Sequence, residues 1–143
     1  MVNLLKPTVG GIIYRAVNNK TEVLLTKRNV EPFKNYWCIP GGHIEPYEEA
    51  ETAVIREVRE ETNLDFTPEF LCYLDEIFSE MEIHNVVLVF YGISSGNIIK
   101  SEDEVTEIEW VEINEAIKME LAFCHREALV IFLNRIIHPV LNK

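Results

Sequence analysis

The chain has 143 residues, of which 48% are hydrophobic and 26% are charged, proportions that are usual for one folded domain. The formal net charge of −11 argues against a broad basic surface, so nucleic acid is an unlikely partner. No apolar run approaches the roughly 18 residues that a membrane span needs, and the N-terminus lacks a signal-peptide pattern. The three cysteines form no CxxC spacing. We therefore expect a single domain over residues 1–143, located in the cytoplasm.

The first part of the chain alternates apolar, β-branched segments with turn residues. Residues 7–14 predict a strand, and residues 22–26 predict a second strand that forms a hairpin with the first across the turn at residues 18–20. Residues 37–39 predict a short buried strand that ends at a proline and the Gly41–Gly42 pair. Glycine allows another backbone or a ligand to approach closely, although a plain turn would need the same residues.

A helix is predicted to follow, from about Pro46 to Glu61. Proline suits the first turn of a helix, and Glu48 and Glu49 suit the positive end of the helix dipole. Asn63 tolerates the left-handed conformation that commonly ends a helix.

Strands and two helices are predicted for the second half of the chain. Residues 70–77 and 85–93 read as strands, and the second is almost continuously apolar, which favours a central position in a sheet. An acidic loop at residues 101–104 precedes an alternating segment, 107–111, that predicts another strand. Asn114 is expected to cap a short helix, and a last amphipathic helix is expected over about residues 123–137.

The predicted helix carries a group of glutamates near its end. Residues three and four positions apart share one face of a helix, so Glu57, Glu60 and Glu61 are expected to project together. The same stripe is made of small apolar residues one and two turns earlier, which indicates that it faces the protein. Clustered carboxylates in a cleft suit Mg²⁺ or Mn²⁺. The alternative is a solvated acidic helix whose charges Arg56 and Arg59 compensate, and the pattern alone leaves both interpretations open.

The spacing of this region resembles the Nudix box, G-x5-E-x7-R-E-U-x-E-E-x-G-U, in which U is a bulky aliphatic residue. Eight of its nine fixed positions match, namely Gly42, Glu48, Arg56, Glu57, Val58, Glu60, Glu61 and Leu64. The exception is Asn63, which stands where the family has glycine and can adopt the same backbone conformation. A Trp-x-x-Pro-Gly-Gly entry at residues 37–42 extends the resemblance, which covers most of the chain, from about residue 7 to residue 111.

The resemblance implies an α/β fold, specifically an α/β/α sandwich with a mixed central sheet, in which the box forms a loop–helix–loop. It also implies hydrolysis of a nucleoside diphosphate that is linked to another group. By position in the box, Glu57, Glu60 and Glu61 would bind Mg²⁺ or Mn²⁺, and Glu57 would also serve as the base or assist it.

The resemblance assigns roles to further residues. Arg56 would pair with Glu48 and hold the loop against the helix, and the backbone of Gly41 or Gly42 would approach metal or phosphate. Glu104 in the acidic loop is the candidate for an extra metal ligand or an alternative base. Arg28 is a candidate phosphate contact, and a solvated strand end is the alternative for it.

The substrate is less well defined by the sequence. Residues 31–42 and 121–125 resemble the ADP-ribose pyrophosphatase branch of the family, which favours a small-molecule nucleotide such as ADP-ribose. A nucleoside triphosphate pyrophosphohydrolase that removes oxidised nucleotides is the first alternative. The second is a nucleotide-sensing domain without catalysis, against which the intact glutamates argue.

Other residues support weaker expectations. Phe33, Tyr36 and Tyr47 could stack on a base or serve in packing. The four histidines share no metal-binding spacing, so we expect each to be structural. The last helix could form part of a homodimer interface, or its apolar face could cover the sheet.

Overall fold

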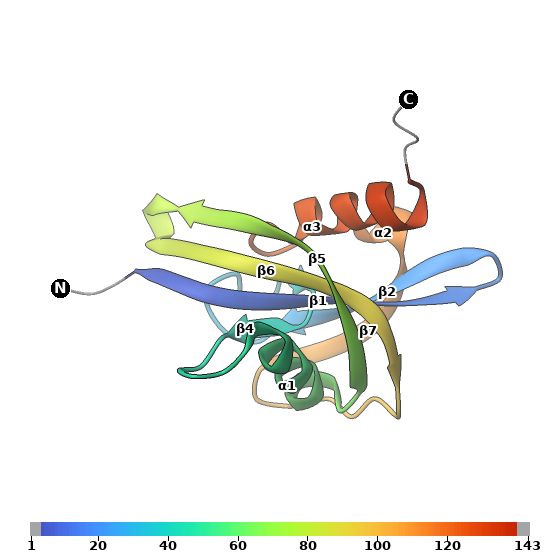
Figure 1. The fold of residues 1–143 in the computed structure, drawn as a ribbon, viewed down its shortest axis with the longest axis horizontal. Helices are drawn as coiled ribbons and strands as arrows, with labels where there is room; N and C mark the ends of the chain where they lie inside the picture. Colours follow the sequence, from blue (N-terminus) through green and yellow to red (C-terminus); the bar gives the residue numbers. More distant parts are fainter. Residues whose placement is uncertain (1–3, 140–143) are drawn as a thin grey trace.

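The computed structural model describes residues 4–139, which form a long mixed sheet with helices on both of its faces (Figure 1). The strands are β1 (Leu5–Val17), β2 (Lys20–Arg28), β3 (Trp37–Cys38), β4 (Gly41–His43), β5 (Asp65–Phe78), β6 (Ile83–Ser95) and β7 (Val105–Glu112). The helical segments are α1 (Ala50–Thr62), η1 (Ser79–Met81), α2 (Ile113–Ala116), α3 (His125–Phe132) and the π-helical η2 (Leu133–Ile137). No helix within residues 4–139 is long and apolar enough to cross a membrane.

The sheet is organised around β1. Its strand order is β3-β2-β1-β6-β5, with β4 paired to β1 and β7 paired to β2. The pairing of β1 with β6 is parallel and the other pairings are antiparallel, so the sheet is mixed, as the sequence predicts. The predicted hairpin is present, and its register places Tyr14 opposite Val23. Strand β6 lies between β1 and β5, which confirms the central position expected for it.

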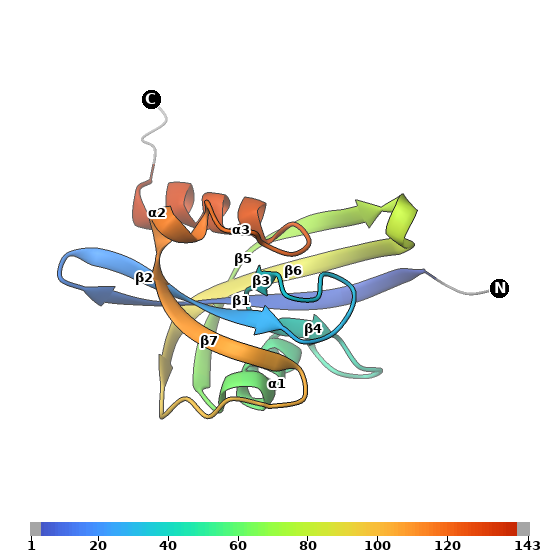
Figure 2. The same ribbon diagram turned by 180° about the vertical axis from the view of Figure 1, so that it is seen from behind.

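Both faces of the sheet are covered because successive residues of a strand point to opposite sides. On one face, Ile12 and Leu25 pack with α2 and α3 in a core that includes Phe132. On the other face, Ile13 and Leu24 pack against α1. Figures 1 and 2 show α1 on one side of the sheet and α2 and α3 on the other. The α/β/α sandwich is therefore confirmed, and the apolar face of α3 covers the sheet.

Several predicted boundaries were wrong. Helix α1 begins at Ala50 rather than near Pro46, because residues 46–49 form the end of a loop in which the exposed Tyr47 has a φ of 66°. The strand predicted over 70–77 begins at Asp65, where it pairs with the end of β6. The cap of α2 is Glu112, whose carboxylate accepts from the backbone N–H of Asn114. The predicted stop at Asn63 is confirmed, since its φ is 67°.

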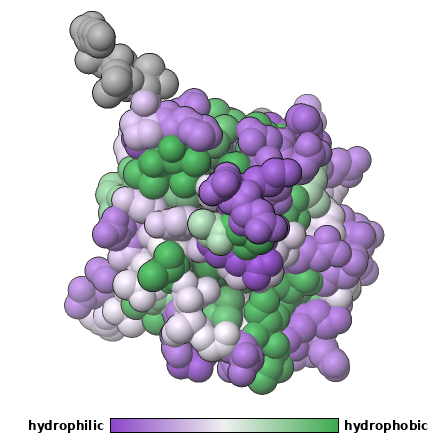
Figure 3. Space-filling view, turned by 90° about the vertical axis from the view of Figure 1, so that its right-hand side faces the viewer, coloured by the Kyte–Doolittle hydropathy of each residue, from purple (hydrophilic) through white to green (hydrophobic). Residues whose placement is uncertain are grey.

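The surface at the β1–β2 hairpin end mixes hydrophilic and hydrophobic side chains (Figure 3). The apolar patches there are interrupted by polar ones, which is usual for the surface of a folded domain.

Candidate active site

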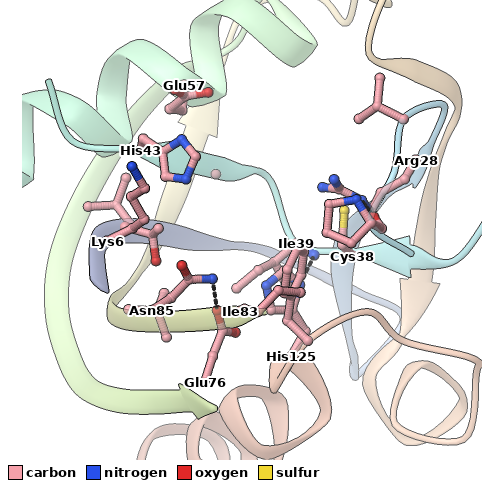
Figure 4. Close-up of a pocket in the computed structure, with 18 of the residues that line it drawn as sticks. Lys6, Arg28, Cys38, Ile39, His43, Glu57, Glu76, Ile83, Asn85 and His125 are labelled. Carbon is pink, nitrogen blue, oxygen red and sulfur yellow. Dashed lines mark hydrogen bonds between the residues drawn. The ribbon is translucent and has the colours of Figure 1, made fainter. Parts of the chain in front are cut away.

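A cavity of about 680 Å³ lies at one end of the sheet, between the helix α1 and the start of α3 (Figure 4). Its walls include most of the residues that the sequence singles out, namely Arg28, Gly41, Gly42, Arg56, Glu57, Glu60, Glu61 and Glu104. Glu48 is not among the residues that line the cavity, and it contacts the cavity residue Arg56 instead. The structure therefore brings together side chains from β2, β4, α1 and the loop before β7.

The end of α1 supplies the carboxylates of this cavity. Glu57 and Glu61 are buried, with 9% and 6% of their surface exposed, and they follow the buried Ala53 and Val54 on the same face. This confirms that the stripe faces the protein. Glu60 differs from the expectation, because 53% of its side chain is exposed and it stands at the rim. A helix turns by about 100° per residue, so Glu60 lies about 100° from Glu61 and at the edge of the face that buries Ala53, Val54, Glu57 and Glu61, and only two of the three carboxylates lie in the interior.

Arg56 holds the loop before α1 against the helix. Its Nε and Nη2 donate to the two carboxylate oxygens of Glu48 at 2.7 and 2.9 Å. This bidentate ion pair fixes both groups in one plane. Its Nη2 also donates to the carbonyl oxygen of His43 at 3.1 Å. The predicted pairing of Arg56 with Glu48 is therefore present. The same interaction lowers the pKa of Glu48 to about 2.

The glycine pair lies directly against the carboxylates. The backbone N–H of Gly41 donates to Glu61 Oε2 at 2.9 Å. A Cβ atom at Gly42 would lie 2.6 Å from the carboxyl carbon of Glu57, so only glycine leaves room for that side chain. The predicted close approach at this pair is thus an approach to the glutamates themselves.

Burial controls the ionisation of the two inner carboxylates. It raises the pKa of Glu57 from 4.5 to about 7, with Arg56 opposing and the charges of Glu60 and Glu104 adding to the shift. It raises the pKa of Glu61 well above 4.5, and the N–H of Gly41 partly opposes this. Arg56 only partly offsets the effect of burial at Glu57, so this end of the cavity favours a further positive charge.

Arg28 and Glu104, the candidate site residues outside the box, also line the cavity. The guanidinium of Arg28 lies 5.0 Å from the ring centre of Phe123, and its Nε donates to the carbonyl oxygen of Pro32 at 2.7 Å. Glu104 is exposed in its loop and is close enough to Glu57 and Glu61 to raise the pKa of both. The aromatic candidates Phe33 and Tyr36 pack against each other with ring centres 5.4 Å apart, which favours the packing interpretation for them.

Four buried polar residues of the cavity were not predicted as site residues, namely Thr8, Glu76, Asn85 and His125. His125 is structural as expected, because its Nδ1 accepts from the backbone N–H of Ile39 at 3.1 Å, but it also lines the cavity. Asn85, at the start of the apolar run in β6, was an available signal, whereas Glu76 is one of several acidic residues in β5.

The donor set suits a hard divalent cation. Within residues 4–139, no three acidic, histidine or cysteine side chains already have the arrangement of a metal site. However, Arg56 Nη1 lies 3.0 Å from Glu57 Oε1 and 3.3 Å from both carboxylate oxygens of Glu60, so a positive group already bridges these two side chains. Carboxylate oxygens are the ligands that Mg²⁺ and Mn²⁺ prefer, so the support for a cation comes from the chemistry of these side chains and not from their present arrangement.

Comparison with known proteins agrees with this geometry. ADP-ribose pyrophosphatase of Methanocaldococcus jannaschii is 36% identical over 124 residues, which cover 85% of this chain and 69% of that protein. Nucleoside triphosphatase NudI of Escherichia coli is 28% identical over 109 residues, which cover 68% of this chain and 76% of NudI. The NUDIX domain of Shewanella oneidensis NrtR, solved with ADP ribose, shares the fold, with a TM-score of 0.83 and 23% identity over 94% of this chain and 90% of that one.

The family model described as NUDIX domain matches residues 5–131, which include every strand, α1 and most of α3. The matched segment contains both walls of the cavity, the glycine pair and all the glutamates discussed above. The chain belongs to the Nudix family, and it is a pyrophosphohydrolase of that family.

Proposed function

We propose that this Nudix hydrolase cleaves the diphosphate linkage of ADP-ribose, giving AMP and ribose 5-phosphate. The observation that carries the proposal is the cavity, which joins the glutamates of α1 to a second polar wall formed by β1, β5 and β6. Such a cavity can hold a group on each side of a diphosphate. The 36% identity to an ADP-ribose pyrophosphatase over 85% of the chain supports the choice of substrate.

We assign Glu57, Glu60 and Glu61 as the residues that would hold Mg²⁺ or Mn²⁺. When bound, the ion supplies the positive charge that phosphate oxygens need beside carboxylates, and it lowers the pKa of a bound water. Arg56 positions Glu57 and Glu60 through its Nη1, and Glu48 fixes Arg56 in turn. The N–H of Gly41 orients the carboxylate of Glu61.

Two carboxylates are candidates for the general base. Glu57 is held by Arg56 in the interior, while Glu104 enters the cavity from an exposed loop. Arg28, which also lines the cavity, is the candidate contact for a phosphate oxygen. Because Glu104 is also a candidate metal ligand, a Glu104→Gln variant assigns the base to the loop only if it loses most of its turnover while the Mg²⁺ concentration that gives half of the maximal rate stays unchanged.

A nucleoside triphosphate pyrophosphohydrolase is the second candidate function, supported by the 28% identity to NudI. A sensing domain without catalysis is a third interpretation, against which the retained Glu57, Glu60 and Glu61 argue. The proposed enzyme acts as one domain in the cytoplasm and forms a homodimer. Sedimentation analysis of the purified chain would test the homodimer. Its interface would have to use a surface other than the apolar face of α3, because that face covers the sheet.

A nucleotide panel tests the proposed reaction. The purified protein is incubated with Mg²⁺ or Mn²⁺ and with ADP-ribose, other nucleoside diphosphate sugars, and ordinary and oxidised nucleoside triphosphates. Release of AMP is scored against release of pyrophosphate, with a chelator as the blank. We expect ADP-ribose to have the highest kcat/KM and to yield AMP. Much faster turnover of a nucleoside triphosphate, with pyrophosphate as the product, would reverse the ranking.

A further inference from the structure

The wall of the cavity opposite α1 contains three buried polar side chains, Thr8 of β1, Glu76 of β5 and Asn85 of β6, which we call the distal site. Their exposed fractions are 8%, 2% and 8%. The strand register brings them together. Glu76 of β5 is paired with Asn85 of β6. Thr8 of β1 is paired with Val87, which lies two residues after Asn85 in β6. In Figure 4, the pair of Glu76 and Asn85 lies across the cavity from Glu57.

The hydrogen bonds of the distal site make it rich in acceptors. Asn85 Nδ2 donates to Glu76 Oε1 at 3.1 Å, and the backbone N–H of Cys124 donates to Glu76 Oε2 at 3.1 Å. Since a carboxylate accepts, the amide of Asn85 must turn its NH₂ group towards Glu76. Its carbonyl oxygen is then directed elsewhere as an acceptor. Each carboxylate oxygen of Glu76 also retains acceptor capacity.

Thr8 adds an unused polar group to the same wall. Its Oγ1 is buried and has no hydrogen-bond partner among residues 4–139. A buried hydroxyl without a partner destabilises a fold, because its hydrogen bonds to water are lost and not replaced. A valine has nearly the same shape and would avoid this cost. Because Thr8 lines the cavity, a ligand bound against this wall could supply the missing partner.

We propose that the distal site binds the hydroxyl groups of the sugar attached to the second phosphate of the substrate. This inference rests on the proposed function and names the part of the substrate that this wall recognises. Sugar hydroxyls donate to the oxygens of Glu76 and Asn85 and can also accept from Thr8. A phosphate group would be repelled by the buried carboxylate of Glu76.

A nucleobase suits the distal site less well than a sugar. A base edge carries one or two N–H donors beside its ring-nitrogen acceptors, so it matches fewer oxygens of this wall than sugar hydroxyls do, each of which can donate and accept. A base also needs a free aromatic face on which to stack. Phe123 lines the cavity, but its ring is already engaged by the Arg28 guanidinium at 5.0 Å and by Phe33 at a ring-centre distance of 4.8 Å.

Two substitutions separate binding from structural support. Thr8→Val removes the hydroxyl without breaking a hydrogen bond of the fold, so it should raise the melting temperature while weakening sugar binding. Glu76→Gln can keep its bond to Cys124, but its NH₂ group then forces the amide of Asn85 to turn round. The acceptor of Asn85 is thereby replaced by a donor in the cavity. Asp75→Asn is the matched control, because it removes the same charge from the neighbouring, exposed position of β5.

The two products of the proposed reaction are the probes, because neither is consumed. Ribose 5-phosphate and AMP are each titrated by calorimetry, with Mg²⁺ present, into the wild type and the three variants. We expect the Kd for ribose 5-phosphate to rise about ten-fold or more in Glu76→Gln and about three-fold or more in Thr8→Val. The Kd for AMP should change less than about two-fold in both, and Asp75→Asn should match the wild type for both probes.

Three other binding results would overturn the proposal of a sugar site. Weakened AMP binding with unchanged ribose 5-phosphate binding would place the nucleoside in the distal site. Unchanged binding of both probes in folded variants, or a wild type that does not bind ribose 5-phosphate, would remove the site altogether. Hydrolysis of ADP-ribose is followed with the same wild-type sample. Its absence, together with the predicted binding losses, would refute the proposed reaction and leave the sugar site standing.

Discussion

At the scale of single residues, His125 shows how the cavity wall fixes a titratable group in one state. Its Nδ1 accepts the N–H of Ile39, so the neutral ring must carry its hydrogen on Nε2. Burial, with a smaller contribution from Arg28, lowers its pKa from 6.5 to about 3. A protonated ring could not accept from Ile39. The wall next to the glycine pair therefore depends on a neutral histidine.

This state predicts a loss of stability in acid. The unfolded chain protonates His125 below about pH 6.5, whereas the folded chain does so only near pH 3. The free energy of unfolding should therefore fall as the pH decreases from 6.5 towards 3, by about 2 kcal/mol between pH 8 and pH 5 from this group alone. In His125→Asn, whose side-chain oxygen can still accept from Ile39, this dependence is absent.

Denaturant unfolding of the wild type and His125→Asn at several pH values checks this prediction. The free energy of unfolding of the wild type, relative to that of His125→Asn, should fall by about 2 kcal/mol between pH 8 and pH 5. Glu57, Glu61 and Glu76 titrate in both proteins, so their opposite effects cancel in the difference. His138→Asn, which changes an exposed histidine, is the control. A stability difference between the wild type and His125→Asn that stays constant with pH, or a pH-dependent difference that His138→Asn also produces, would show that His125 is not held neutral.

At the scale of elements, the loop and helix from Gly41 to Thr62 form one unit. Arg56 joins the loop to the helix through Glu48 and His43, and the glycine backbone contacts the carboxylates of the helix. The two glycines have different neighbours, which allows their roles to be separated. A Cβ at Gly42 would meet the flexible end of Glu57, whereas a Cβ at Gly41 would lie 2.1 Å from the backbone oxygen of Val9.

We predict opposite outcomes for alanine at these two positions. Gly42→Ala should fold with only a small loss of melting temperature but lose turnover by about 100-fold or more, because Glu57 must move. Gly41→Ala should lose several degrees of melting temperature, because the pairing of β4 with β1 cannot adjust to the new methyl group. Thermal unfolding and steady-state kinetics of both variants check this. A Gly42→Ala enzyme with wild-type kinetics would show that the position of Glu57 is not critical.

Much of this unit could be predicted from the sequence because its contacts are local. Helical spacing predicts that Glu57 and Glu61 share the face of Ala53 and Val54, and the structure buries all four. The start of the helix could not be read in this way. Pro46 suits the first turn of a helix, but Glu48 is held by Arg56 outside the helix, and this contact between two segments decides where the helix begins.

At the scale of the whole molecule, the α/β/α sandwich follows from the box and the strand patterns, but the far wall of the cavity does not. Thr8, Glu76 and Asn85 come from three strands, and only the register of β1, β6 and β5 makes them neighbours. Register depends on pairing between distant segments, which strand patterns alone do not specify. This explains why the glutamates of α1 were predicted as site residues and the residues opposite them were not.

The charge of the whole molecule also bears on the reaction. A chain with a formal net charge of −11 and several carboxylates in its main cavity repels a diphosphate unless cations offset this charge. We therefore expect turnover to require both the divalent cation and the carboxylates that hold it, and we expect the buried end of α1 to carry out the phosphate chemistry.

The most direct test of this claim is the kcat/KM for ADP-ribose at saturating Mg²⁺ in the wild type, Glu57→Gln and Glu60→Gln. Glu51→Gln, an exposed position in the first turn of the same helix, is the control. We predict that Glu57→Gln and Glu60→Gln each lose about 100-fold or more while remaining folded, and that Glu51→Gln matches the wild type. Rates close to the wild type in both Glu57→Gln and Glu60→Gln would show that these carboxylates do not carry out the reaction.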